Sequence, residues 1–110
     1  MKLIHFPAAN NADVVLLLRS ASLQGKALDI LRRELRTLAT AGRRLVLDLS
    51  AVHSLSFLAA QLIVEVATRL RLSGGSLKLT NITAPAAAFL ELFRVPRSVE
   101  MGAGIETLAA

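Results

Sequence analysis

Residues 44–73 constrain the fold more than any other part of the sequence. A short apolar run ends at Asp48, a polar turn spans Ser50 to Ser56, and an apolar segment then continues to Gly74-Gly75. This order predicts a buried strand, a turn rich in hydroxyl groups and a helix whose first N–H groups lack partners within the helix. Because ligands of open α/β proteins bind at such strand-to-helix turns, we expect the functional site here.

Hydrophobic periodicity divides the rest of the chain into further elements. Continuous or alternating apolar runs predict strands, and apolar residues at steps of three and four predict helices. The expected strands cover residues 2–6, 14–19, 44–49, 76–80 and 98–101. The expected helices cover residues 26–41, 57–72, 84–93 and 104–109. Gly42 suits the position just after the first helix, and Ser20 to Gly25 is predicted to be a loop.

This order of elements predicts an α/β fold. Short connections between strands and helices favour parallel βαβ units with right-handed crossovers. We therefore expect a mostly parallel sheet of four to five strands, with residues 2–6 as an edge strand that an antiparallel orientation would also suit, and about four helices. The length of 110 residues predicts one domain, residues 1–110.

Composition narrows the classes of function. The chain has no cysteine, which excludes disulfides, thiolate metal sites and a cysteine nucleophile. No apolar run approaches the ~18 residues of a membrane span, and Pro7 ends the first segment too early for a secretory signal. These features predict a cytoplasmic protein. The hydrophobic share of 54% leaves two interpretations open, a larger core or an apolar surface for a partner.

The formal net charge of +5 favours an anionic partner, whether nucleic acid, anionic lipid or an acidic protein. The absence of Trp and Tyr argues against a protein that stacks bases of single-stranded nucleic acid. The only dense basic group is either a solvated face or a docking surface for an acidic partner or RNA; it comprises Arg32, Arg33, Arg36, Arg43 and Arg44.

Several short motifs occur in the order of a known family. Asp48, Leu49, Ser50 and Val52 match a D-L-S-G-V block, and Gly74-Gly75 precede LKLTNI as a G-G pair precedes a strand and N-V in that family. The segment with Leu92, Phe93 and Val95 is similar to L-E-L-x-G-L, and Ala21-Ser22-Leu23 is similar to a G-x-L-D turn. The chain resembles the STAS family, the domain of sulfate transporters and anti-sigma factor antagonists. The resemblance covers nearly the whole chain and implies a STAS-like fold in a bacterial regulator of transcription.

The chain departs from this family at the phosphorylation site. The family's D-S-S-G or D-T-S-G block falls on Ser56, Phe57, Leu58 and Ala59, so Leu58 stands where the family has its phosphorylatable hydroxyl. Family members use this loop and helix to contact a kinase-type anti-sigma factor. The resemblance therefore implies a non-catalytic protein-binding module without the usual switch. Its implied partner is an anti-sigma factor or a related regulatory protein, bound through Ser54, Ser56, Phe57, Leu58, Ala59 and Gln61.

Two alternatives stay open for the residues of this site. Ser56 is either the N-cap of the helix or a displaced phospho-acceptor, together with Ser54. Phe57 and Leu58 either begin the core face of the helix, which the spacing of Leu58 from Leu62 suits, or form an exposed anchor for a partner.

No motif predicts catalysis, a metal or a cofactor. Asp48 ends a strand, as the phospho-acceptor of a receiver domain does, but the acidic pair and the lysine of such a domain are missing, so we expect a structural role. Ser54, His53 and Asp48 are too close in sequence to face one another as a triad. The other classes that we retain are a cytosolic STAS subunit of a membrane transport assembly and a small-ligand or nucleotide pocket at the same helix start.

Overall fold

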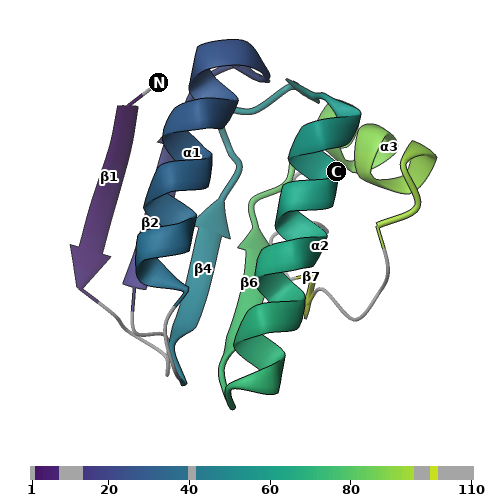
Figure 1. Ribbon diagram of the computed structural model, residues 1–110. Helices are drawn as coiled ribbons and strands as arrows, with labels where there is room; N and C mark the ends of the chain where they lie inside the picture. Colours follow the sequence, from purple (N-terminus) through teal and green to yellow (C-terminus); the bar gives the residue numbers. More distant parts are fainter. Residues whose placement is uncertain (1, 8–13, 40–41, 96–99, 102–110) are drawn as a thin grey trace.

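The computed structural model describes residues 2–7, 14–39, 42–95 and 100–101 (Figure 1). Its main sheet has the strand order β1-β2-β4-β6-β7. β1 is antiparallel to β2, and all the other neighbours in the sheet are parallel. The predicted mostly parallel α/β sheet with an edge strand is thus confirmed. The strands are β1 (Lys2–Pro7), β2 (Val14–Arg19), β4 (Arg44–Asp48), β6 (Ser76–Thr80) and β7 (Glu100–Met101).

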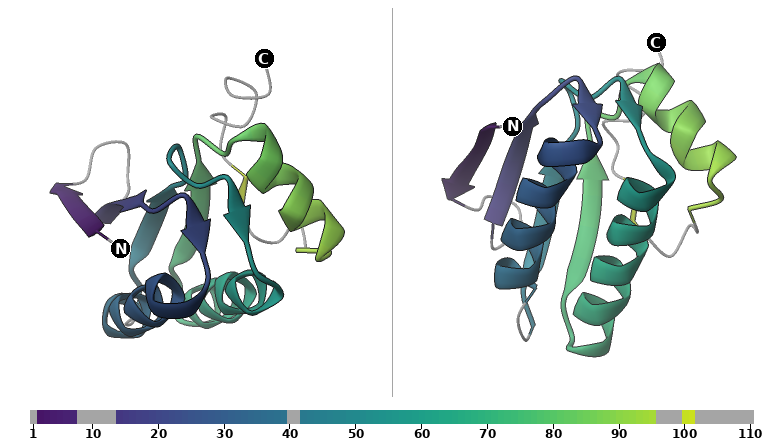
Figure 2. Two further views of the ribbon diagram at one scale, coloured as in Figure 1. Left: turned by 90° about the horizontal axis from the view of Figure 1, so that it is seen from above. Right: turned by 45° about the horizontal axis from the view of Figure 1, so that its top comes forward.

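The described residues form three helices, α1 (Gly25–Leu38), α2 (Phe57–Leu72) and α3 (Ala84–Leu92). α1 and α2 lie side by side across one face of the sheet, and α3 lies beyond the carboxyl ends of the strands (Figures 1 and 2). The bounds of α2 are those predicted. The fourth helix, predicted over residues 104–109, falls outside the described residues.

α1 ends at Leu38, three residues before the predicted end at residue 41. The capping residue Ala39 donates its N–H to the carbonyl of Leu35 at 2.7 Å. Gly42 has a left-handed φ of +73°, but it lies too far along the chain to be the residue that follows the cap. The prediction for Gly42 was therefore wrong, although the position does require a backbone conformation that glycine favours.

Two short strands appear where the sequence predicted only turns. β3 (Ser22–Leu23) and β5 (Ser54–Leu55) pair in parallel as a separate small sheet. Two residues are too few for a periodic signal, so the pairing arises from the fold that brings the two turns together at the carboxyl edge. Leu23 and Leu55 are both buried there.

Leucines fill the layer between the sheet and the two long helices. Along β2, β4 and β6, alternate residues are buried in one core cluster with the buried residues of α1 and α2: Leu16, Leu18, Leu45, Leu47, Leu77 and Leu79. α1 meets them with four leucines at steps of three and four, Leu28, Leu31, Leu35 and Leu38. Full burial of one such side chain stabilises the fold by about 1.5–3 kcal/mol. None of the helices in the described ranges has the length and apolar character that crossing a membrane requires.

The turn after α2 lies at the end of the sheet where β4 and β6 begin. Gly74 has a left-handed φ of +88°, and Gly75 donates its N–H to the carbonyl of Leu70 at 2.7 Å. This bond and the left-handed glycine are features of a Schellman ending of α2. Ser76 then donates its N–H to the carbonyl of Arg43 at 3.0 Å, which joins this turn to the start of β4.

Gly75→Ala is expected to lower the free energy of unfolding by about 3 kcal/mol or more, because a Cβ atom there would lie 1.9 Å from the carbonyl oxygen of Arg43. Gly74→Ala is the matched control: its Cβ would meet nothing within 4 Å, so only the left-handed backbone opposes it, at about 1 kcal/mol. Urea unfolding of both variants measures the difference. Equal losses would show that the close approach at Gly75 relaxes without cost.

Candidate functional site

The start of α2 is capped by Ser56. Its backbone is extended (φ −79°, ψ 165°), and its Oγ accepts a hydrogen bond from the N–H of Ala59 at 3.2 Å. Ala60 donates its N–H to the Ser56 carbonyl at 3.1 Å. The N-cap interpretation of Ser56 is thus confirmed. Ser54 is half-buried, and its Oγ donates to Oγ of Ser22 at 2.9 Å, so both candidate hydroxyls make bonds that support the fold.

Asp48 holds the turn that leads to α2. One carboxylate oxygen accepts the N–H of Ser50 at 2.9 Å, and the other accepts the side-chain amide of Asn81 at 3.0 Å. Asp48 therefore has the structural role predicted for it. These bonds join the end of β4 to the segment that follows β6.

A buried hydroxyl connects the same turn to α3. Thr83 donates its Oγ1–H to the carbonyl of Val52 at 2.5 Å and accepts the N–H of Ala86 at 3.2 Å, as the N-cap of α3. On the other side, the carbonyl of Ala21 accepts the N–H groups of His53 and Ser54 at 2.8 and 3.1 Å. These hydrogen bonds hold the turn on both sides, and the end of the turn sets the position at which α2 begins.

The geometry does not assemble a triad from Ser54, His53 and Asp48. Ser54 and Asp48 have the partners named above, and the side chain of His53 is exposed. Across the part of the chain that the structure describes, no three His, Cys, Asp or Glu side chains gather closely enough to bind a metal ion.

Phe57 and Leu58 are the two large apolar residues that project from the first turn of α2. Their side chains are 51% and 56% exposed. Of the two interpretations left open for Leu58, the core position does not hold, because the buried face of this turn consists of Ala59 and Ala60 and continues with Leu62 and Ile63. Gln61 is also exposed, whereas Ala59 is fully buried and faces the core.

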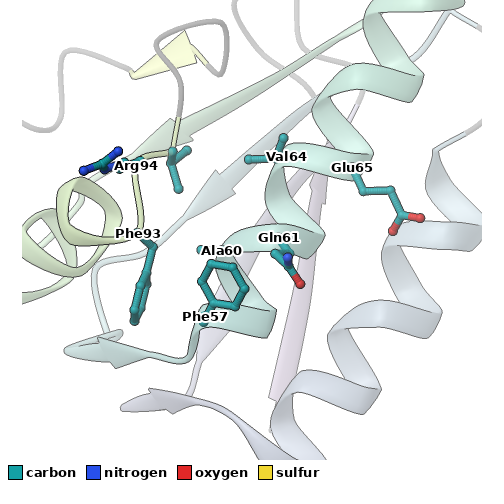
Figure 3. A pocket seen from close by; sticks show the side chains of 8 residues that line it. Phe57, Ala60, Gln61, Val64, Glu65, Phe93 and Arg94 are labelled. Carbon is teal, nitrogen blue, oxygen red and sulfur yellow. The ribbon is translucent and has the colours of Figure 1, made fainter.

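A groove runs between α2 and the end of α3 (Figure 3). It has a volume of about 400 Å³, and it is lined by Phe57, Ala60, Gln61, Val64, Glu65, Phe93, Arg94 and Val95. The rings of Phe57 and Phe93 meet edge to face with centroids 5.7 Å apart, and Phe93 stacks with Phe89 at 6.0 Å. Three of the four phenylalanines of the chain thus form one cluster beside the helix start.

A second hollow of about 300 Å³ lies on the other flank of α2, toward α1. Arg32, Leu58, Gln61, Leu62 and Glu65 line it. Gln61 and Glu65 border both hollows, so the outer ridge of α2 separates them. Phe57 lies on one side of this ridge and Leu58 on the other. We call the surface formed by Phe57, Leu58, Gln61, Glu65 and the two hollows the docking face.

Comparison with known protein families identifies the fold. The model of a family described as "Mlab, STAS domain" matches residues 6–101, which is most of the chain. The chain belongs to the STAS family. The comparison with curated proteins found no match. STAS domains are in general binding modules, and the resemblance predicted from the sequence motifs is confirmed.

The sequence pattern did not predict the apolar residues that complete the groove of this STAS domain. Phe93 is the C-cap of α3 and follows Phe89 by four residues, and Val64 follows Phe57 by seven residues on α2. This spacing was visible, but only the packing of α3 beside the start of α2 brings the two sets together. A concentration of three phenylalanines in a chain with few aromatic residues is the signal that would have pointed to them.

Arg94 adopts a strained conformation at the rim of the groove. Its φ is +55°, in the left-handed region that glycine favours. The N–H of Arg94 donates to the carbonyl of Glu91, and that of Val95 donates to the carbonyl of Leu90, both at 3.0 Å. This pair of bonds is the Schellman ending of α3, and it imposes the left-handed conformation on Arg94.

Arg94→Gly is expected to raise the free energy of unfolding of this STAS domain by about 1 kcal/mol, because glycine removes the steric strain at this position. Arg94→Lys keeps a Cβ atom and is expected to leave stability nearly unchanged. Urea unfolding compares both with the parent protein. A loss of stability in Arg94→Gly would mean that contacts of the arginine side chain outweigh its backbone strain.

Proposed function

We propose that this STAS domain is a non-catalytic protein-binding module of the anti-sigma factor antagonist type. It binds an anti-sigma factor or a related regulatory protein through the docking face, without a phosphorylation switch. The observation that carries this proposal is the exposure of Phe57 and Leu58 on a rigid helix start with a hollow on either side. Large apolar side chains of this kind, on a preorganised surface, are typical anchors of protein interfaces.

The energetics favour contact through these two residues. Each side chain keeps about half of its surface in water, and burying that surface releases free energy in proportion to its apolar area. The polar groups that surround them, Gln61 and Glu65 on the ridge and Arg94 at the rim, supply the hydrogen bonds and charges that orient a partner. The strain at Arg94 supports a role for its side chain, since such conformations often occur where function requires them.

Leu58 makes the binding constitutive in this proposal. Leucine has no hydroxyl group, so phosphate cannot be added where the STAS family has its switch. A phosphate at this position would bring a charge of about −2 into the centre of the apolar contact. Binding is then governed by the amounts of the two proteins and not by modification of this side chain.

A second candidate function is that of a cytosolic subunit in a membrane transport assembly. The same exposed pair favours it, because permanent complexes have more apolar interfaces than transient ones. A docking residue that cannot be switched suits a permanent subunit as well as a constitutive regulator.

Native co-purification with the tagged chain tests the proposal. The parent protein is expected to recover one partner in a fixed ratio. Phe57→Asp and Leu58→Asp are each expected to weaken binding at least tenfold, because a carboxylate would be buried among apolar groups. The identity of the partner separates the two candidates: a soluble regulator supports the first, and a membrane-protein complex supports the second.

Leu72→Asp is the matched control, since Leu72 is an exposed leucine at the far end of the same helix. It is expected to bind the partner as the parent does. Circular dichroism of each variant checks that the fold is intact. A partner that tolerates both carboxylates at the docking face, or that is lost equally with Leu72→Asp, would rule out this site.

A further inference from the structure

Five arginines lie at the end of the molecule opposite the docking face. α1 and α2 end there, and β4 and β6 begin there (Figure 1). Arg36 lies in the last turn of α1, and Arg69 and Arg71 lie in the last turn of α2. Arg43 and Arg44 precede and begin β4 at the same end. We call these five arginines the basic edge.

The described stretches at this end are basic. The stretches that form this end, residues 35–39, 42–47 and 66–79, contain no aspartate or glutamate. They contain Lys78 in addition to the five arginines.

Helix dipoles explain only part of this pattern. Basic residues in the last turns of α1 and α2 interact favourably with the negative ends of the helix dipoles. Arg43 and Arg44 lie outside the helices, and each has an interaction within the protein. Helix dipoles do not account for Leu72, whose apolar side chain is 82% exposed one residue after Arg71 and three residues after Arg69.

We propose that the basic edge binds the surface of an anionic lipid bilayer. The guanidinium groups contact lipid phosphates, and Leu72 enters the interfacial region between them, while the aliphatic parts of the arginines cover apolar surface around it. Each basic residue near an anionic surface strengthens binding about fivefold, which is the equivalent of about 1 kcal/mol. The resulting attachment is reversible. No aromatic residue lies in the stretches that form this end, which disfavours stacking on nucleic acid bases.

The basic edge is rigid and separate from the docking face. Gly42 donates its N–H to Oγ of Ser73 at 3.2 Å, and that Oγ donates to the carbonyl of Leu70 at 2.9 Å, which ties the loop before β4 to the end of α2. The 16 residues of α2 put its two ends about 24 Å apart. A bilayer at one end therefore leaves Phe57 and Leu58 accessible, so this inference does not rest on the proposed partner.

Co-sedimentation with vesicles tests the inference. The full chain is expected to bind vesicles of phosphatidylcholine with about 30% phosphatidylglycerol, and to bind pure phosphatidylcholine at least tenfold more weakly. Binding is expected to fall as salt is raised. The double variant Arg69→Gln/Arg71→Gln is expected to lose at least tenfold in affinity for the anionic vesicles. Leu72→Ser is expected to lose about threefold or more while its dependence on salt is unchanged.

The matched control is Arg19→Gln/Lys26→Gln, which removes the same charge at the exposed end of β2 and start of α1, away from the basic edge. It is expected to keep most of the binding. An equal loss in the control would show that only net charge matters and would overturn the inference. Equal binding to both kinds of vesicle would also overturn it. So would the absence of detectable vesicle binding together with salt-sensitive binding to an acidic polypeptide or RNA.

Discussion

The burial of one sheet face beneath α1 and α2 is the constraint on which the other features depend. Because leucines from three strands and from both helices share this layer, α2 is held along its length by its inner side. Because the inner side of α2 is fixed in the core, the residues on its outer side also have fixed positions. The positions of Phe57 and Leu58 at one end, and of Arg69, Arg71 and Leu72 at the other, follow from that burial and not from contacts of their own.

Hydrogen bonds at the carboxyl edge then set the place where α2 begins. Asp48 and Thr83 link the turn before α2 to the segment after β6 and to α3, and the carbonyl of Ala21 holds it from the opposite flank. A buried hydroxyl or carboxylate without these partners would cost about 1–3 kcal/mol, so the bonds specify one arrangement of the turn. The same connection brings α3 and its phenylalanines beside Phe57. A rigid helix start with a groove on each side is the result, and this preorganisation is what a binding surface requires.

Much of the fold was predictable because it depends on periodic patterns. The alternating and helical spacing of leucines located the long strands and helices, and the motif around Asp48 with the Gly74-Gly75 pair identified the family. The short strands β3 and β5 were missed, since two residues have no period. The end of α1 was placed too late, because the apolar and helix-forming residues continue past Leu38 without a residue that stops the helix. The place of Leu58 was left open because its spacing from Leu62 suits a core position as well as an exposed flank.

The sequence by itself determined that position 58 carries a leucine, which has no hydroxyl group to phosphorylate, since the chemistry of a side chain does not depend on the fold. It also indicated Ser56 as a candidate N-cap of α2, because capping depends on a few neighbouring residues. Only the tertiary structure decided that Phe57 and Leu58 are exposed, that Phe93 and Arg94 lie beside them, and that five arginines from separate segments meet at one end. These features depend on which elements pack together, and residues distant in the sequence become neighbours only when the shared core is buried.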